Sequence, residues 1–231
     1  MEKMKEKKVK MFKSIHPDSC RVFHDIEQNT DQWLGFRAKR VAGTTFSTVL
    51  SGKKTDGYID TIKRIAVETL SGEPVETAFY GNKTTQRGHD LEPLALIEYE
   101  RLMFCEVNRG GFFAFTDFVG VSPDGHYHRG NDFIGVEAKC PEYKKFIEYL
   151  LNPEELVNDY YTQVQGEIYG CGFAFVDLFA YYPGYNLVKV RVYPDEKFLF
   201  KLENEIELAK EAVNKLIEIL KINRIDYKGN K

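Results

Sequence analysis

The chain has 231 residues, of which 43% are hydrophobic and 29% are charged, as is ordinary for a globular protein with room for one large core. Its formal net charge is only −3, so binding to nucleic acid would require basic residues gathered locally rather than a basic excess over the whole chain. No apolar run approaches the length of a membrane-spanning helix, which argues against an integral membrane protein.

The N-terminal residues 1–20 are rich in lysine and lack the apolar core of a signal peptide. We expect them to form a flexible basic segment, followed by a single domain over residues 21–231, in a cytoplasmic protein. The four cysteines include no C-x-x-C pair, which argues against a zinc site and against an iron–sulfur cluster.

A phosphate-binding site is predicted in the first part of that domain. A helix is expected over residues 31–37, and Gly43-Thr44-Thr45 opens the next one. The free backbone N–H groups at a helix N-terminus bind anions, and Arg37 lies close by. Arg37 and Thr44 are therefore candidates for binding a phosphate group. The alternative is an ordinary helix cap beside a surface arginine.

Two longer helices are predicted over residues 58–70 and 84–102, because apolar residues recur there three and four positions apart. Glu92 adjoins the apolar stripe of the second helix, where a carboxylate is costly to bury without a partner. We therefore treat Glu92 as a candidate functional acid, and the alternative is one more exposed helical glutamate. Pro93 indicates that this helix begins late or is kinked.

A hairpin of two strands is predicted between Val119 and Pro141. Its first strand ends in the turn sequence Gly-Val-Ser-Pro-Asp-Gly, which contains Asp124. The returning strand, residues 133–139, carries Glu137 and Lys139 two positions apart, so their side chains project on the same side. Two carboxylates and one ammonium should therefore meet at the end of the hairpin.

The charged groups of this hairpin have a specific chemical use. The carboxylates of Asp124 and Glu137, with the backbone carbonyl of Ala138, offer the hard oxygen ligands that Mg²⁺ or Mn²⁺ prefers. Lys139 beside such an ion can orient a water or lower its pKa, and this combination hydrolyses a phosphodiester. The alternative is a hairpin with a solvated polar face, because D…E-x-K spacing often arises by chance.

Two histidines, His126 and His128, fall in the turn-rich gap between the two strands. Imidazole is a common metal ligand, so contact with a metal or with DNA is one interpretation. We favour the other, in which both residues lie in a mobile loop of the hairpin.

The C-terminal half completes an alternating pattern of helices and strands. Helices are predicted over residues 143–151, 159–170 and 196–223, and strands over residues 173–182 and 187–193. The first of these strands is almost entirely apolar and belongs inside a sheet, whereas the second alternates and belongs at an edge. We infer an α/β fold with a mixed central β-sheet flanked by helices.

Four sequence blocks, in this order, resemble the lambda exonuclease and YqaJ viral recombinase family of the PD-(D/E)xK nuclease superfamily. They are Trp33-x-x-x-Arg37 running to Ala42-Gly43-Thr44; Gly88-x-x-x-Glu92; Gly120-Val-Ser-Pro-Asp124-Gly; and Glu137-x-Lys139-Cys-Pro141 followed by Tyr161-x-Gln163-Val-Gln165. Each block is short, and it is their shared order and spacing that carry the resemblance.

The resemblance implies a restriction-endonuclease-like core and a Mg²⁺-dependent DNA exonuclease. Such an enzyme digests linear double-stranded DNA from its ends, 5′ to 3′, and leaves 3′ single-strand overhangs for phage-type recombination. Two Mg²⁺ ions, replaceable by Mn²⁺, are expected in the site. A homo-oligomer in the form of a toroidal trimer, a single-strand annealing protein as partner, and a phage-encoded protein in the host cytoplasm are implied as well.

The resemblance also assigns roles to particular residues of this chain. Catalytic and metal-binding roles fall on Asp124, Glu137, Ala138 through its backbone carbonyl, Lys139, Glu92 through a water, and Gln163. Contacts with the 5′-phosphate and the DNA fall on Arg37, Thr44 and Gln165. The alternative for the two glutamines is the polar face of an amphipathic helix.

Two other functions remain open. A structure-specific or restriction-type endonuclease could use the same core, and only an endonuclease would cut covalently closed circular DNA. A non-catalytic DNA-binding protein could have kept the fold, although the presence of Asp124, Glu137 and Lys139 speaks against it.

Overall fold

The computed structural model describes residues 22–43, 45–75 and 83–223. The predicted basic segment over residues 1–20 and the candidate phosphate-binding residue Thr44 lie outside the described residues. None of the helices in the described ranges is both long and apolar enough to cross a membrane.

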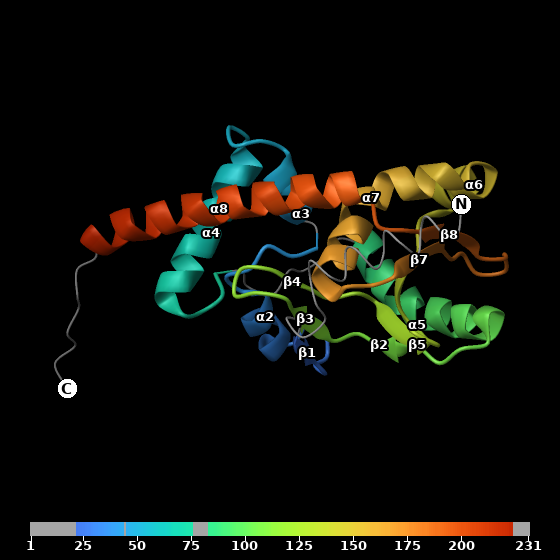
Figure 1. Ribbon diagram of the computed structural model, residues 1–231. Coiled ribbons are helices and arrows are strands. Elements are labelled where there is room, and N and C mark those ends of the chain that lie inside the picture. Colours follow the sequence, from blue (N-terminus) through green and yellow to red (C-terminus); the bar gives the residue numbers. More distant parts are fainter. Residues whose placement is uncertain (1–21, 44, 76–82, 224–231) are drawn as a thin grey trace.

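The described strands form two sheets (Figure 1). The larger has the order β2-β5-β6-β7-β8 and consists of β2 (Asn108–Arg109), β5 (Gly125–Arg129), β6 (Asp132–Lys139), β7 (Phe175–Ala180) and β8 (Val188–Val192). The smaller has the order β1-β3-β4 and consists of β1 (Val22–His24), β3 (Phe112–Ala114) and β4 (Gly120–Val121). Rings of the two sheets meet, as in the pair Phe113 and Phe133.

The larger sheet is mixed, which confirms the predicted fold class. Strands β6 and β7 run parallel, whereas the other paired strands described in this sheet are antiparallel. Strand β7 is buried along its whole length and lies inside the sheet, as its apolar sequence predicts. Strand β8 forms an edge, again as predicted.

Seven described helices surround the sheets. They are α2 (Asp31–Arg37), α3 (Thr45–Leu50), α4 (Asp56–Ser71), α5 (Lys83–Met103), α6 (Tyr143–Leu151), α7 (Pro153–Cys171) and α8 (Glu196–Ile222). Local signals set several of their ends. The Thr30 hydroxyl caps α2 by accepting from the N–H of Trp33, and the Asp195 carboxylate caps α8 by accepting from the N–H of Phe198. Gly72 ends α4 in the left-handed region, with φ of 85°.

Helix α7 differs from its predicted bounds because of a proline, whereas α5 keeps its predicted bounds to within one residue despite one. Helix α7 begins at Pro153, six residues before the predicted start, since proline suits the first turn of a helix, where its missing N–H has no partner to lose. Helix α5 runs through Pro93 without the late start that was one of its two predicted outcomes. Helix α7 packs against β6, β7 and β8 of the larger sheet.

Helices cover both faces of the larger sheet, with α7 on one side and α5 on the other. Val176 and Leu178 of β7 join a hydrophobic core with side chains of α4, α7 and α8. Phe175 and Phe179, which alternate with them along the strand, join a second core with Leu96 of α5. The alternating sides of β6 and β7 therefore face α7 on one side and α5 on the other.

The prediction that His126 and His128 lie in a mobile loop is wrong, because both belong to strand β5. The pairing of β5 with β6 continues to the last residue of β5, so the turn is tighter than the sequence suggests. His126 is only 7% exposed and lies among the rings of Phe23, Phe113 and Phe133.

Candidate active site

Strand β6 places Glu137 and Lys139 side by side on the face of the sheet that α7 covers. Glu137 is only 1% exposed, and its Oε1 accepts a hydrogen bond from Lys139 Nζ at 2.6 Å. The Lys139 ammonium also lies 4.5 Å from the centre of the Tyr160 ring. The two side chains project together, as their spacing on one strand predicts.

Asp124 lies just before β5 and is joined to β6 by a hydrogen bond. Its Oδ2 accepts from the backbone N–H of Ala138 at 2.8 Å. Ala138 stands between Glu137 and Lys139 in the sequence, so the bond fixes Asp124 next to both. The hairpin therefore brings its three charged groups together as expected.

Helix α7 contributes Gln163 and, one turn later, Glu167. The amide of Gln163 donates to Glu137 Oε1 at 2.5 Å and to Glu167 Oε1 at 3.1 Å, and its carbonyl oxygen accepts from Lys139 Nζ at 3.2 Å. Glu167 is 2% exposed. It was not among the predicted site residues, although its position four residues after Gln163, on the same helix face, could have indicated it.

Helix α5 brings Glu92 to the same place. A cavity of about 520 Å³ opens between α5, α7, β6 and the segment around α2. The predicted site residues that line it are Arg37, Glu92, Asp124, Glu137, Ala138, Lys139 and Gln163. Residues from four separate parts of the chain thus face one cavity.

The charges of this cavity are out of balance, because several carboxylates surround one ammonium. Burial, followed by repulsion from Glu137, raises the pKa of the carboxyls of Asp124, Glu92 and Glu167 above their ordinary values. Burial acts to lower the pKa of Lys139, but attraction to Glu137 and Asp124 outweighs it and raises that pKa. A further positive charge would therefore be stabilised here.

The oxygen atoms of the cavity suit a divalent cation that prefers hard ligands. Glu137 Oε2 and Glu167 Oε2 are buried and have no hydrogen-bond partner, which is costly for carboxylate oxygens unless a cation lies nearby. No three acidic, histidine or cysteine side chains in the described ranges are already arranged as a closed metal site. The donor set fits Mg²⁺ or Mn²⁺ by its chemistry, with Glu137 at its centre.

Two of the predicted DNA contacts differ in their placement. Arg37 lines the cavity, with its guanidinium carbon 5.1 Å from the centre of the Trp33 ring. Gln165 is instead fully buried outside the cavity, where its amide donates to the Tyr193 carbonyl at 2.8 Å and its carbonyl accepts from the Asp195 N–H at 3.0 Å. A DNA contact for Gln165 does not fit this arrangement, because side chains two apart on a helix point to different sides.

Comparison with known proteins gives one family and several similar structures. Residues 32–174 match the family described as the YqaJ-like viral recombinase domain. No curated protein matches the chain in sequence.

The similar structures share the fold at low sequence identity. An alkaline exonuclease from Laribacter hongkongensis is 23% identical, with a TM-score of 0.72, over 84% of this chain and 97% of that one. Its complex with dAMP gives a TM-score of 0.71 at 22% identity, with the same coverage. A phage-related exonuclease from Haemophilus somnus is 16% identical, with a TM-score of 0.61, over 78% of this chain and 96% of that one.

Proposed function

The chain belongs to the YqaJ-like viral recombinase family, which makes it a nuclease, and we propose that it is a divalent-metal-dependent exonuclease acting on the ends of linear duplex DNA. The finer features of the proposal are digestion from 5′ to 3′, the release of mononucleotides, and 3′ single-strand overhangs that serve recombination. The observation that carries it is the buried, unpartnered Glu137 Oε2 in a cavity that Asp124, Lys139 and Gln163 also reach.

In this proposal Asp124, Glu137 and the Ala138 carbonyl hold Mg²⁺ or Mn²⁺, with Glu92 acting through a water and a second ion bound nearby. A divalent ion held there would supply positive charge to the scissile phosphate and favour the ionised form of water. The raised carboxyl pKa values support this assignment, because a cation would relieve the repulsion between the acids.

Lys139 positions the attacking water from its ammonium group. Its hydrogen bonds to Glu137 and Gln163 hold the ammonium at the cavity wall. Gln163 also bonds Glu137, so one neutral amide orders both charged groups and can donate to the phosphate without adding charge. These contacts hold the reacting groups in a fixed arrangement before the DNA binds.

Recognition of a DNA end is proposed to come from Arg37. It lines the same cavity, and a guanidinium suits the two oxygens of a terminal phosphate. Thr44, outside the described residues, is proposed as its partner. The structure of the similar alkaline exonuclease with dAMP supports a mononucleotide product here.

Digestion of end-labelled linear duplex tests the proposal. With Mg²⁺, we expect labelled mononucleotides from the 5′ end, faster when that end carries a phosphate, and no digestion in EDTA. Covalently closed circular duplex should stay intact. Cutting of the circle would favour the endonuclease alternative, and unchanged digestion in EDTA would remove the metal from the mechanism.

A further inference from the structure

A second cavity, of about 470 Å³, lies next to the catalytic one. It is lined by Gln86, Arg87, Asp90, Leu91, Tyr182 and Pro183. We propose that it binds an unpaired nucleobase of the DNA strand whose phosphate occupies the catalytic cavity. The inference rests on the proposed function, since DNA must be the substrate.

The cavity lies at the carboxyl ends of the two parallel strands, where α/β sheets commonly bind ligands. Tyr182 and Pro183 follow the end of β7. Arg87 of α5 donates to the backbone carbonyls of Cys140 and Pro141, which follow the end of β6, at 2.6 and 2.8 Å. The wall of the second cavity is therefore in contact with the chain segment that directly follows Lys139.

Helix α5 joins the two cavities. Gln86 and Arg87 line the second cavity, and the next two residues, Gly88 and His89, line the catalytic one. Arg87 of the second cavity also donates to the carbonyl of Cys140, which lines the catalytic one, so the two walls are in direct contact. A nucleotide with its phosphate near Lys139 would have its base, or that of its neighbour, within reach of the second cavity.

The walls of the second cavity suit the flat face of a base. The guanidinium of Arg87 lies over the Tyr182 ring, with its carbon 5.2 Å from the ring centre, so a base would stack against this Arg87–Tyr182 pair, and Leu91 and Pro183 add apolar surface. Aromatic rings and arginine planes are the groups on which unpaired bases stack, and such stacking tolerates any base. Only an unpaired base is free to enter, because a paired one is already stacked in the duplex.

Two polar side chains in the wall of this cavity suit the edge of a base. Gln86 donates to Asp90 Oδ1 at 2.9 Å, and both residues are exposed on α5. This pair offers an amide and a carboxylate for hydrogen bonds with the edge of a base. A mostly apolar cavity with a few polar groups at its rim is the usual form of a site for a small planar ligand.

The Tyr182 ring is fixed before any ligand binds. It packs against Phe146, with ring centres 5.6 Å apart, and against Tyr185, at 6.0 Å. A ring that is already ordered loses little entropy on binding, which favours stacking. Tyr185 belongs to the same aromatic cluster and is 60% exposed, but it does not line the cavity, so it provides a matched control.

Binding of a short, fluorescently labelled single-stranded oligodeoxyadenylate, measured by anisotropy in EDTA, tests this inference apart from cleavage. Tyr182→Leu should weaken binding about tenfold, the loss expected for one stacked base, whereas Tyr185→Leu should not change it. For an oligonucleotide of the same length with abasic sites throughout, Tyr182→Leu should bind as the wild type does. Leu91→Trp fills the cavity and leaves Tyr182 in place. Like Tyr182→Leu, it should lose the part of the oligonucleotide affinity that depends on the bases.

Equal binding of both oligonucleotides by the wild type and by both cavity variants would overturn the nucleobase site, as would a loss that does not depend on the bases. If the wild type also digests linear duplex with Mg²⁺, the proposed function stands while the nucleobase site fails. If the wild type neither digests nor binds DNA, both fail.

Discussion

Glu167 is a buried acid with one oxygen bonded to Gln163 and the other without a partner. We expect it to position Gln163, and through it Lys139 and Glu137. Glu167→Ala should slow cleavage about tenfold to a hundredfold and raise the Mg²⁺ concentration needed for half-maximal rate, since groups behind metal ligands have effects of this size. Glu167→Gln, which keeps a hydrogen-bonding oxygen, should slow cleavage less than Glu167→Ala does.

Glu154 provides the control for this prediction because it is exposed on the same helix, α7. Glu154→Ala should leave both the rate and the Mg²⁺ requirement unchanged. If Glu167→Ala also titrates with Mg²⁺ like the wild type and cleaves at the same rate, Glu167 is only a packing residue.

His126 makes folding stability depend on pH. Burial, with a smaller contribution from His128 and against the attraction of Asp25, lowers the pKa of His126 to about 4. The unfolded chain binds the proton near pH 6.5, so this contribution is present above that pH and is lost as the pH falls from 6.5 towards 4. The full loss is on the order of 3 kcal/mol.

Replacement of His126 by phenylalanine should remove that dependence, because the residue already lies among phenylalanine rings. Urea unfolding at pH 7.5 and pH 5 measures it. The wild type should lose more stability than His126→Phe on acidification. The acids with raised pKa values gain stability on acidification in both proteins, so they cancel in the comparison. Parallel losses in the two proteins would contradict this role of His126.

At the level of helices and strands, Gln165 ties α7 to the segment between β8 and α8. Its two hydrogen bonds satisfy the Tyr193 carbonyl and the Asp195 N–H. Gln165→Leu should therefore reduce the free energy of unfolding by about 2 kcal/mol and leave DNA affinity unchanged. Gln163→Ala should slow cleavage, which Gln165→Leu should not, and it should cost stability as well, because Gln163 bonds Glu137, Lys139 and Glu167.

Denaturant unfolding and anisotropy binding of duplex DNA, measured on both variants, separate the two glutamines. A variant at Gln165 that unfolds like the wild type but binds DNA more weakly would restore the DNA contact predicted from the sequence.

Elements with local signals could be predicted from the sequence, and those defined by distant contacts could not. Helix α2 has its Thr30 cap, and β7 is apolar apart from Asp177, so both were found near their true bounds. Strand β5 was not predicted, because its sequence contains two histidines and its burial depends on rings contributed by β1 and β3. The start of α7 at Pro153 was missed because a proline serves equally as a helix end and a helix beginning.

In the candidate site, too, local spacing predicts the positions of some residues, whereas distant contacts decide the others. Glu137 and Lys139 share one strand, so their common direction follows from spacing alone. The position of Asp124 beside them follows from the predicted hairpin, which brings the two strands together. Packing decides which side of α7 turns toward the sheet; once Gln163 is placed there, Glu167 four residues later shares its side and Gln165 two residues later does not. Glu92 comes from a separate helix; its position beside an apolar stripe made it a candidate, and the resemblance to the nuclease family added its metal role.

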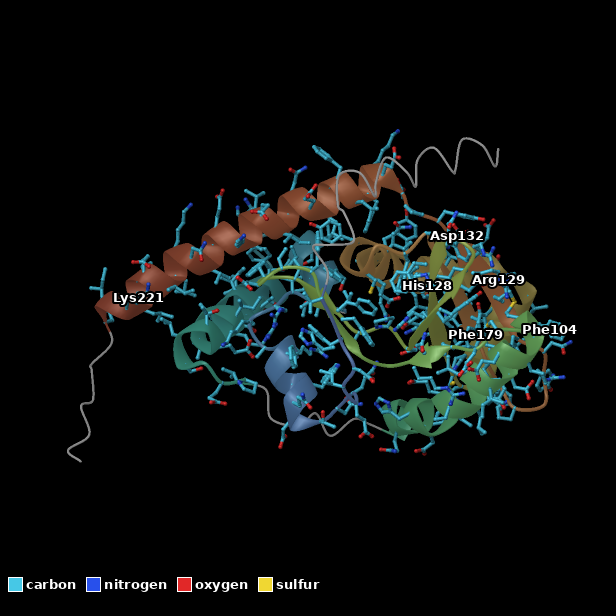
Figure 2. The ribbon with its side chains drawn as sticks, turned by 60° about the horizontal axis from the view of Figure 1, so that its bottom comes forward. Phe104, His128, Arg129, Asp132, Phe179 and Lys221 are labelled. Atoms are coloured by element: carbon cyan, nitrogen blue, oxygen red, sulfur yellow. The ribbon has the colours of Figure 1, made fainter. Side chains whose placement is uncertain are left out.

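For the molecule as a whole, apolar surface remains at several separated places. Figure 2 places Phe104, at the end of α5, far from Lys221, which is the neighbour of the exposed Ile222 at the end of α8. Phe104 is 93% exposed, and Leu151 and Ile222 are 80% and 84% exposed. Exposed apolar residues can mark protein interfaces. The toroidal trimer and the annealing partner stay predictions.

The repulsion between the acids of the catalytic cavity predicts how metal affects the stability of the whole protein. Mg²⁺ at about a hundred times its Kd should raise Tm by roughly 5–10 °C relative to EDTA, because it binds only the folded chain. Asp124→Asn removes one of the repelling charges, so it should raise Tm in EDTA and reduce the response to Mg²⁺. Thermal unfolding of both proteins with and without Mg²⁺ checks this. Equal Mg²⁺ shifts would place the ion elsewhere.

Cleavage of linear duplex by Lys139→Ala tests most directly whether this cavity is the catalytic centre. With Mg²⁺ present, we expect a loss of at least about a hundredfold in single-turnover rate, with duplex affinity close to that of the wild type. Lys144→Ala, at an exposed lysine on the neighbouring helix α6, should cleave normally. A rate for Lys139→Ala within a few fold of the wild type would contradict catalysis at this site.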